Sequence, residues 1–247
     1  MRDARELGGA WRRHQRHETA APAPELAGYV AHYWTVHWDY AEPYRQLITA
    51  LPQVHLTVGG PAGATVRGVT RGHRHQTLTG RGRVFGVAFR PGAFRPILKA
   101  PVSGLTDRVA AAADVFGAEP PEHPDVASIE EFLLARLPEP DPASRAAVAA
   151  VAVIAADPEL TRVDRLAAEL GFPVRTLQRL FAEHVGVSPK WVLRRYRVHE
   201  VARRLEAGAA IDWPGLAAEL GYADQAHFVR DFTRMMGEPP TRYAARY

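Results

Sequence analysis

Basic side chains gather in one stretch of the sequence, between Pro173 and Arg204. This stretch holds eight basic residues and two acidic ones, a local surplus of six positive charges. The surplus exceeds the net charge of +4 that the whole chain carries. Clustered arginine and lysine side chains are typical of surfaces that bind nucleic-acid phosphates. The basic residues are Arg175, Arg179, Lys190, Arg194, Arg195, Arg197, Arg203 and Arg204.

The triplet His73-Arg74-His75 is a second candidate for chemistry, because two imidazoles on one face of a strand can bind a metal ion. The triplet is similar to the first half of a cupin metal motif. The glutamate expected a few residues later is absent, since residues 76–80 read QTLTG. We favour a surface loop over a metal site, and we predict no metal and no cofactor.

Aromatic residues mark a third candidate, an effector pocket along the segment from Tyr29 to Trp38. If this segment is a regular strand, Tyr29 and Tyr33 point to one face, and Trp34 and Trp38 point to the other. Either face would line a pocket, with the small Ala31 leaving room between the two tyrosines. Ordinary core packing of these rings is the favoured alternative.

Composition excludes several classes of protein. The chain has no cysteine, which removes disulfides, thiolate metal sites and cysteine nucleophiles. Residues 1–18 are charged and contain no apolar run, so they are unlike a signal peptide. No stretch approaches the 18 or so consecutive apolar residues of a membrane span. These patterns predict a cytoplasmic protein with no membrane partner.

The elements that position these residues change character near residue 140. Proline-rich segments at 120–124 and 138–142 suit neither a helix nor a central strand. Before them, short alternating runs predict strands, with helices at about 92–99 and 126–137. After them, almost every segment has helical periodicity. We therefore expect a mixed or mainly β domain over 1–140 and an all-helical domain over 143–247. The predicted strands are 29–38, 53–58, 64–69 and 84–90.

The helical part contains an internal repeat. The heptapeptide LAAELGF at 166–172 recurs as LAAELGY at 216–222, an offset of 50. Further on the offset is 51, so one extra residue lies in the second copy, in a turn where an insertion is tolerated. Equivalent pairs there are Arg179 with Arg230, Phe181 with Phe232, Gly186 with Gly237, and Pro189 with Pro240.

Each copy has the pattern of two helices joined by a tight turn. In the first copy, a small residue at Ala167 allows close approach, Gly171 makes the turn, and Leu177 anchors the second helix. Thr161 is the expected cap of the first helix, and Pro173 lies near the first turn of the second. The two helix-turn-helix units are expected at about 160–186 and 212–237.

A long helix over 188–207 is expected to join the two units, with Ser188 as its cap and Pro189 at its first position. A helix of this length spans roughly 30 Å, while one turn of B-DNA advances about 34 Å. Such a linker would present two reading helices to successive major grooves on one face of DNA.

At these residues the sequence resembles the AraC/XylS family of bacterial transcription regulators. The resemblance covers about 145–247 and rests on TLQRLFAEHVGVSP in the first copy and GYADQAHFVRDFTRMMGEPPTRY in the second. Tyr222 departs mildly from the usual phenylalanine. The segments 29–34 and 86–94 look like the N-terminal domain of a subset of these regulators. The family implies a barrel or sandwich-like N-terminal domain that binds an effector or dimerises.

The resemblance also implies the site residues. Those that read bases are Arg175, Gln178, Arg179, Gln225, Ala226 and Arg230. Candidates for phosphate contacts are Thr176, Lys190, Arg194, Thr241 and Arg242. Core positions are Leu166, Leu177, Phe181, Leu216, Phe228 and Phe232. An alternative for Arg179 and Arg230 is an ion pair with a glutamate of the preceding helix.

The sequence thus predicts an α+β chain of two domains that binds promoter DNA, without enzyme activity, under the control of a small-molecule effector. Further partners left open are RNA polymerase and a second copy of the chain. Two alternatives concern the N-terminal domain: a cupin-like, metal-dependent enzyme built on the histidines, or a module that only dimerises.

Overall fold

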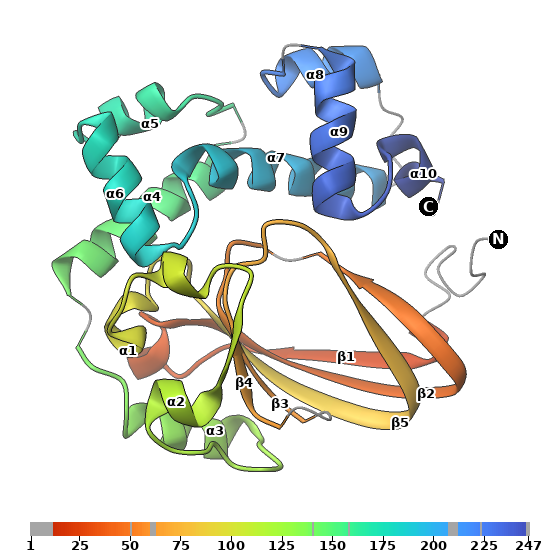
Figure 1. The fold of residues 1–247 in the computed structure, drawn as a ribbon, viewed down its shortest axis with the longest axis vertical. Coiled ribbons are helices and arrows are strands. Elements are labelled where there is room, and N and C mark those ends of the chain that lie inside the picture. Colours follow the sequence, from red (N-terminus) through yellow and green to blue (C-terminus); the bar gives the residue numbers. More distant parts are fainter. Residues whose placement is uncertain are drawn as a thin grey trace.

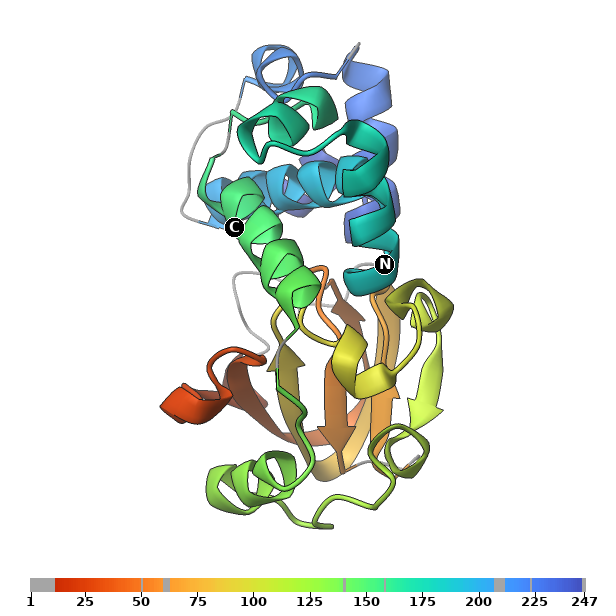
Figure 2. The same ribbon diagram turned by 90° about the vertical axis from the view of Figure 1, so that its left-hand side faces the viewer.

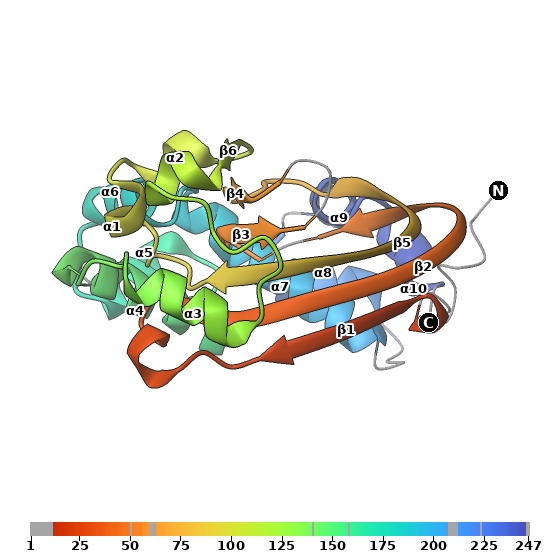
Figure 3. The ribbon, with the colours of Figure 1, turned by 90° about the horizontal axis from the view of Figure 1, so that it is seen from below.

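The chain folds into a strand-rich N-terminal half and a helical C-terminal half (Figure 1). The computed structural model describes residues 12–49, 51–59, 63–139, 141–157, 159–206, 212–222 and 224–245. Seen from below, α7 to α9 lie behind the strands, and α2 and α3 lie toward the left-hand end of the sheet (Figure 3). The predicted combination of a mainly β half with an all-α half is confirmed.

The described strands form one six-stranded sheet in the order β1-β2-β5-β3-β4-β6. Every pairing is antiparallel, and β1 and β6 are the two edges. Because the edges do not pair with each other, the sheet stays open, and the expected barrel is not closed. The strands are β1 (Gln15–Ala20), β2 (Val30–Ile48), β3 (His55–Val58), β4 (Thr65–Arg67), β5 (Arg74–Phe89) and β6 (Val109–Ala111).

The four strands expected from the sequence are all present, but β2 and β5 run much further than predicted. Their outer ends form a long ribbon that packs Tyr40, Tyr44 and Leu78 into a small cluster of its own. The edge strand β1 was not predicted, because its sequence QRHETA has four exposed residues in a row and no apolar alternation.

The two faces of the sheet differ in chemistry. One cross-strand row joins Tyr33, Val87, Leu56 and Val66, all of them buried in the core of this half. Helices η2 (Pro24–Leu26), α1 (Arg95–Leu98), η3 (Val102–Leu105), α2 (Ala112–Phe116) and α3 (Val126–Leu134) contribute to the same core. The neighbouring rows carry Trp34 and His55 and point to the opposite face.

The helical half reproduces the repeat as two equivalent pairs of helices. The first pair is α5 (Val163–Glu169) and α6 (Val174–His184), and the second is α8 (Trp213–Glu219) and α9 (Gln225–Met236). Gly171 and Gly221 both have a φ of +69°, which makes the same left-handed turn in each pair. The first helix of the repeat begins one residue later than predicted, because Arg162 and not Thr161 occupies its cap.

Three further helices hold these pairs together: α4 (Pro142–Ala156), α7 (Pro189–Glu206) and α10 (Pro240–Ala244). Helix α7 begins at Pro189 as predicted, and the backbone N–H of Trp191 donates to Ser188 Oγ. Val192 and Leu193 on α7 belong to the core of the first pair, whereas Val198 and Val201 belong to the core of the second. All six residues assigned to the core are buried.

The two halves touch at both copies of the repeat, and Figure 2 shows the contact at the lower end of α6. Thr106 Oγ1 donates to the carbonyl of Gly186 at 2.6 Å, and His73 Nδ1 donates to the carbonyl of Arg234 at 3.1 Å. Arg95 and Glu183 form an ion pair at 3.5 Å. In a third area of contact, Gly92 of the N-terminal half packs against α4.

Replacing Gly92 by valine tests the packing of the N-terminal half against α4. Gly92 has a φ of +96°, and a Cβ there would lie 2.7 Å from the Val148 nitrogen. We expect the free energy of unfolding to fall by about 1–3 kcal/mol, measured by urea denaturation. The control is Gly104→Ala, where a Cβ meets nothing within 4 Å. Equal stability of the two variants would contradict this account of the contact.

Candidate functional site

The first recognition helix is α6, which buries one side and exposes the other. Leu177 and Phe181 are fully buried, while Arg175, Gln178 and Arg179 are exposed. Because the exposed residues are three and four positions apart, they lie on one face of the helix. Arginine and glutamine on such a face present the hydrogen-bond groups that read guanine and adenine.

The second recognition helix, α9, repeats this arrangement. Phe228 and Phe232 are fully buried, and Gln225, Ala226 and Arg230 are exposed. The Asp224 side chain caps the helix by accepting a hydrogen bond from the His227 backbone N–H at 2.6 Å. Both helices lie on the same side of α7, separated by its length (Figures 1 and 2).

An internal ion pair was the alternative for Arg179 and Arg230. Among the residues that the structure describes, Arg179 makes no ion pair. Arg230 likewise has none with a described side chain, although the side chain of Glu219 on the preceding helix lies outside the described ones. The Arg179 guanidinium is therefore available to bind a ligand at the exposed face of α6.

The candidates for phosphate contacts fall into two groups. Lys190 and Thr241 are exposed, and Thr176 is half-buried beside the first reading face. Arg194 instead turns inward, where its Nη1 lies 3.0 Å from Asp231 Oδ2 and its guanidinium lies over the Tyr222 ring. Arg242 is exposed and pairs with Glu238 at 3.4 Å. Arg194 thus ties α7 to α9 within the protein.

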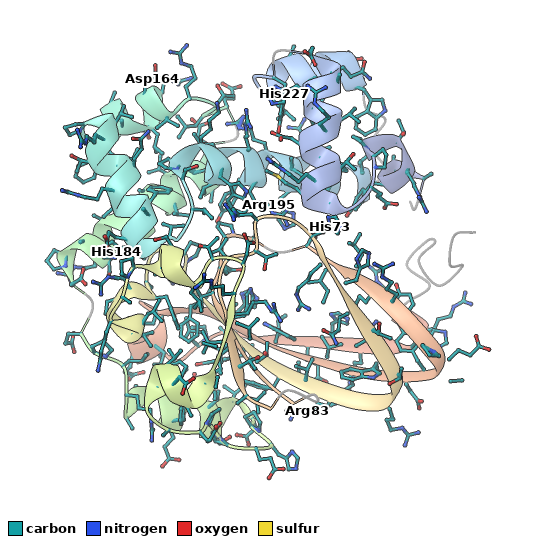
Figure 4. All side chains as sticks on the ribbon, in the orientation of Figure 1. His73, Arg83, Asp164, His184, Arg195 and His227 are labelled. Carbon is teal, nitrogen blue, oxygen red and sulfur yellow. The ribbon has the colours of Figure 1, made fainter. Side chains whose placement is uncertain are left out.

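The sequence count of basic residues overstates the charge of the surface. Arg195 is 1% exposed and donates from Nη1 to the carbonyl of Met235 at 3.1 Å, between α7 and α9 (Figure 4). Arg197 is also buried and donates to the carbonyl of Leu160. Burial lowers the pKa of Arg195 to about 10, which leaves it charged at neutral pH.

This burial has a signal in the sequence. Arg195 falls on the same face as Trp191, Val198, Ala202 and Leu205, at helical spacings of four and three. A basic residue within an apolar stripe is a candidate for an internal hydrogen bond rather than for a phosphate contact.

The four aromatic candidates for an effector pocket separate as the strand alternation predicts. Tyr29 and Tyr33 are buried in the core of the N-terminal half, so the packing alternative holds for them. Trp34 lines a cavity on the opposite face of the sheet. Trp38 lies further out along β2, where its Nε1 donates to the carbonyl of Thr79.

The cavity that Trp34 lines has a volume of about 380 Å³ and lies between the sheet and α7. Its floor is one face of the sheet, and His199 of α7 lies on the opposite wall. The indole of Trp34 lies across Gly86 on the neighbouring strand, where a Cβ would come within 2.0 Å of the ring. Glycine at this position is therefore what allows the ring to lie on the floor.

His55 lies beside this indole and is held neutral. Trp34 Nε1 donates to His55 Nδ1 at 3.3 Å, which uses the lone pair that a proton would need. Burial lowers the pKa of His55 to about 4, and the positive charges of His32, Arg74 and Arg67 add to this effect. From the sequence, His55 is one of five further candidate histidines, with His14, His17, His32 and His37, that have no recognisable metal-ligand spacing.

The histidine pair of the triplet makes contacts within the protein. His73 contacts the end of α9 (Figure 4), and His75 Nδ1 lies 3.3 Å from Arg45 Nη2. Within the described ranges, no group of three or more His, Cys, Asp or Glu residues is placed to hold a metal ion. In the same ranges, no helix has both the length and the hydropathy to cross a membrane.

Two family models match separate parts of the chain. Residues 18–111 match a domain of unknown function (DUF6597), and residues 166–246 match a helix-turn-helix domain. The HTH-type transcriptional activator RhaS of Pectobacterium atrosepticum is 32% identical over 75 residues, which are 30% of this chain and 26% of the relative. RhaS of Pectobacterium carotovorum has the same identity and coverage. The chain thus matches about a quarter of the length of these curated relatives.

The chain also matches solved structures at lower sequence identity. ToxT from Vibrio cholerae has a TM-score of 0.42 at 9% identity, over 95% of this chain and 98% of that one. The C-terminal domain of AraT, a response regulator from Geobacillus stearothermophilus, has a TM-score of 0.37 at 22% identity. That match covers 43% of this chain and 87% of the AraT domain.

The depressed pKa of His55 predicts a loss of stability in mild acid. Between pH 6.5 and 4 the unfolded chain binds a proton that the folded chain does not, so folding weakens as pH falls. At pH 5 this loss amounts to about 2 kcal/mol relative to pH 7. Urea denaturation at both pH values measures it.

His55→Gln is the matched variant, because glutamine keeps a polar group beside Trp34 but does not titrate. We expect the drop in stability between pH 7 and 5 to be smaller in this variant. Part of the drop remains, since burial also lowers the pKa of His32 and His184. An unchanged drop would show that His55 is not the group responsible.

Proposed function

We propose that the chain is a transcription regulator of the AraC family controlled by a small molecule, because residues 166–246 match a helix-turn-helix domain and 75 residues are 32% identical to the transcriptional activator RhaS. In this proposal both copies of the repeat bind promoter DNA in the bacterial cytoplasm. RNA polymerase and a second copy of the chain are further partners in the same proposal. The N-terminal half, over 1–140, receives the effector.

In this proposal, each part of the chain has its own role. The DNA-binding part spans 143–247, with helix-turn-helix units at about 160–186 and 212–237 and the linker helix over 188–207. The observation that carries the proposal is the pair of equivalent exposed faces on α6 and α9. Arg179 and Arg230 occupy matching positions two residues before buried phenylalanines, so each side chain leaves its helix in the same direction.

The length of α7 supports binding to two successive major grooves. Its 18 residues extend about 27 Å, close to the advance of about 34 Å in one turn of B-DNA. Arg175, Gln178 and Arg179 would read one groove, and Gln225 and Arg230 the next, with Ala226 offering a methyl contact. Lys190, Thr176 and Thr241 would hold the backbone. Arg194 and Arg242 each form an ion pair with a carboxylate, so each would contact a phosphate only while it also contacts that carboxylate.

Effector control is proposed from the position of the cavity. The cavity borders α7, the helix that separates the two reading faces. A ligand that binds one arrangement of sheet and helix better than another shifts the population toward that arrangement. Trp34 is retained as a pocket residue in this proposal, whereas Tyr29, Tyr33 and Trp38 are not.

Substitution of the two equivalent arginines tests the proposal. We expect Arg179→Ala and Arg230→Ala each to reduce the preference for the upstream intergenic DNA over a shuffled duplex by about 1–3 kcal/mol. Fluorescence anisotropy across a salt series measures this preference. Lys190→Ala should instead weaken binding to both duplexes and make the salt dependence shallower.

Arg81→Ala is the control, because this exposed arginine pairs with Asp39 at the far end of the sheet. Its preference for the intergenic DNA should equal that of the unaltered protein. The proposal fails if the Arg179 and Arg230 variants keep the full preference of the unaltered protein.

The spacing between the two half-sites is a second test. Once footprinting has located the half-sites, about five base pairs inserted between them turn the second groove to the opposite face of the duplex. We expect this insertion to reduce affinity to that of a single half-site. Insertion of a full turn of about ten base pairs should also fail, because α7 cannot lengthen. Undiminished binding after both insertions would rule out simultaneous reading.

A further inference from the structure

Two arginines, Arg67 on β4 and Arg74 on β5, line the cavity between the sheet and α7. Both are partly buried. Among the described residues, the Arg67 guanidinium makes no hydrogen bond or ion pair, and Arg74 Nη1 has its one partner in Gln76 Oε1 at 3.3 Å. The pKa of Arg74 is lowered to about 10 by burial and by the charge of Arg67. Two guanidinium groups therefore face one cavity without a carboxylate to balance them.

The acidic residues of the same wall do not supply that balance. Glu18 is the one carboxylate that lines the cavity in the described part of the chain, and it pairs with Arg16 at 3.1 Å. His55 is neutral, as its depressed pKa requires. The cavity thus has a net positive charge in partly dry surroundings, where an unpaired charge is costly.

Part of the cavity wall is apolar. The Trp34 indole forms part of the floor, and Val36, Ile48 and Leu51 stand around it. The indole N–H is already bonded to His55, so the ring offers a planar surface for stacking. A volume of about 380 Å³ is at the small end of the range for ligand pockets.

We propose that this cavity binds a small organic anion, with its carboxylate between Arg67 and Arg74 and an apolar or aromatic body on Trp34. The inference rests on the proposed effector control and names the class of the effector. A guanidinium fork pairs with a carboxylate through two parallel hydrogen bonds, so the ligand supplies the partner that Arg67 lacks. Its body displaces water from the indole and the aliphatic side chains.

Calorimetric titration of the full chain with three probes of one shape tests the proposal. The probes are 4-phenylbutyrate, the neutral 4-phenylbutanol and the cationic 4-phenylbutylamine. We expect the carboxylate to bind at least about tenfold more tightly than the alcohol, and the amine to bind most weakly. Arg67→Gln and Arg74→Gln should each reduce the preference for the carboxylate.

Two variants keep the result interpretable. Arg67→Lys retains the positive charge and should retain most of the preference, which separates loss of charge from loss of fold. Arg81→Gln removes an arginine outside the cavity and should leave all three affinities unchanged. Equal affinities for the three probes, no binding of the carboxylate at millimolar concentration, or an undiminished preference in both glutamine variants would overturn the proposal.

The binding of DNA is measured separately, so the two proposals fail separately. A chain that binds 4-phenylbutyrate through Arg67 and Arg74 but has no preference for its intergenic DNA would contradict the proposed function and leave the anion site standing. A chain that reads its DNA but does not distinguish the carboxylate from the alcohol would contradict the anion site alone.

Discussion

The shared burial of α7 is the constraint on which the rest of the helical half depends. Its N-terminal turns complete the core of α5 and α6, and its C-terminal turns complete the core of α8 and α9. Neither pair of helices buries its apolar face without this helix. A single rigid helix that belongs to two cores fixes the distance between α6 and α9, because an α-helix cannot stretch without breaking its hydrogen bonds.

The C-terminal ends of the two recognition helices pack against the N-terminal half. Gly186 and Gly237 are equivalent in the repeat, and both lie against the N-terminal half: a Cβ at the first would meet Val102 and Thr106, and one at the second would meet Leu47 and His73. Side chains also satisfy the carbonyls that a helix leaves unpaired at its C-terminus. Thr106 does this for Gly186, His73 for Arg234 and Arg195 for Met235. The opposite ends of both helices, which carry Arg175 on α6 and Gln225 on α9, point away from the sheet (Figure 1).

The sheet divides its two faces between stability and recognition. The row through Tyr33, Val87, Leu56 and Val66 is apolar throughout and holds the short helices. The residues next to this row in each strand face the cavity instead. They are polar or aromatic, or small as at Gly86. Because neighbouring side chains alternate between the two faces, a single strand such as β2 supplies both a core residue, Tyr33, and a floor residue, Trp34. The same face then meets α7, so the cavity borders the helix that spaces the two reading faces.

The sequence by itself determined the local and repeated features of this protein. The offset of the repeat, the turn glycines Gly171 and Gly221, and the buried positions of both copies follow from short-range periodicity, and all are present in the structure. The two-face split of Tyr29, Tyr33 and Trp34 follows from alternation in the same way. The tertiary structure alone decided which face of the sheet lines a cavity and which partners Arg194, Arg195 and Arg197 bind within the protein. The physical reason is that burial of a long polar side chain depends on carbonyls and carboxylates distant in the sequence, such as Met235, Leu160 and Asp231, whose proximity no local pattern encodes.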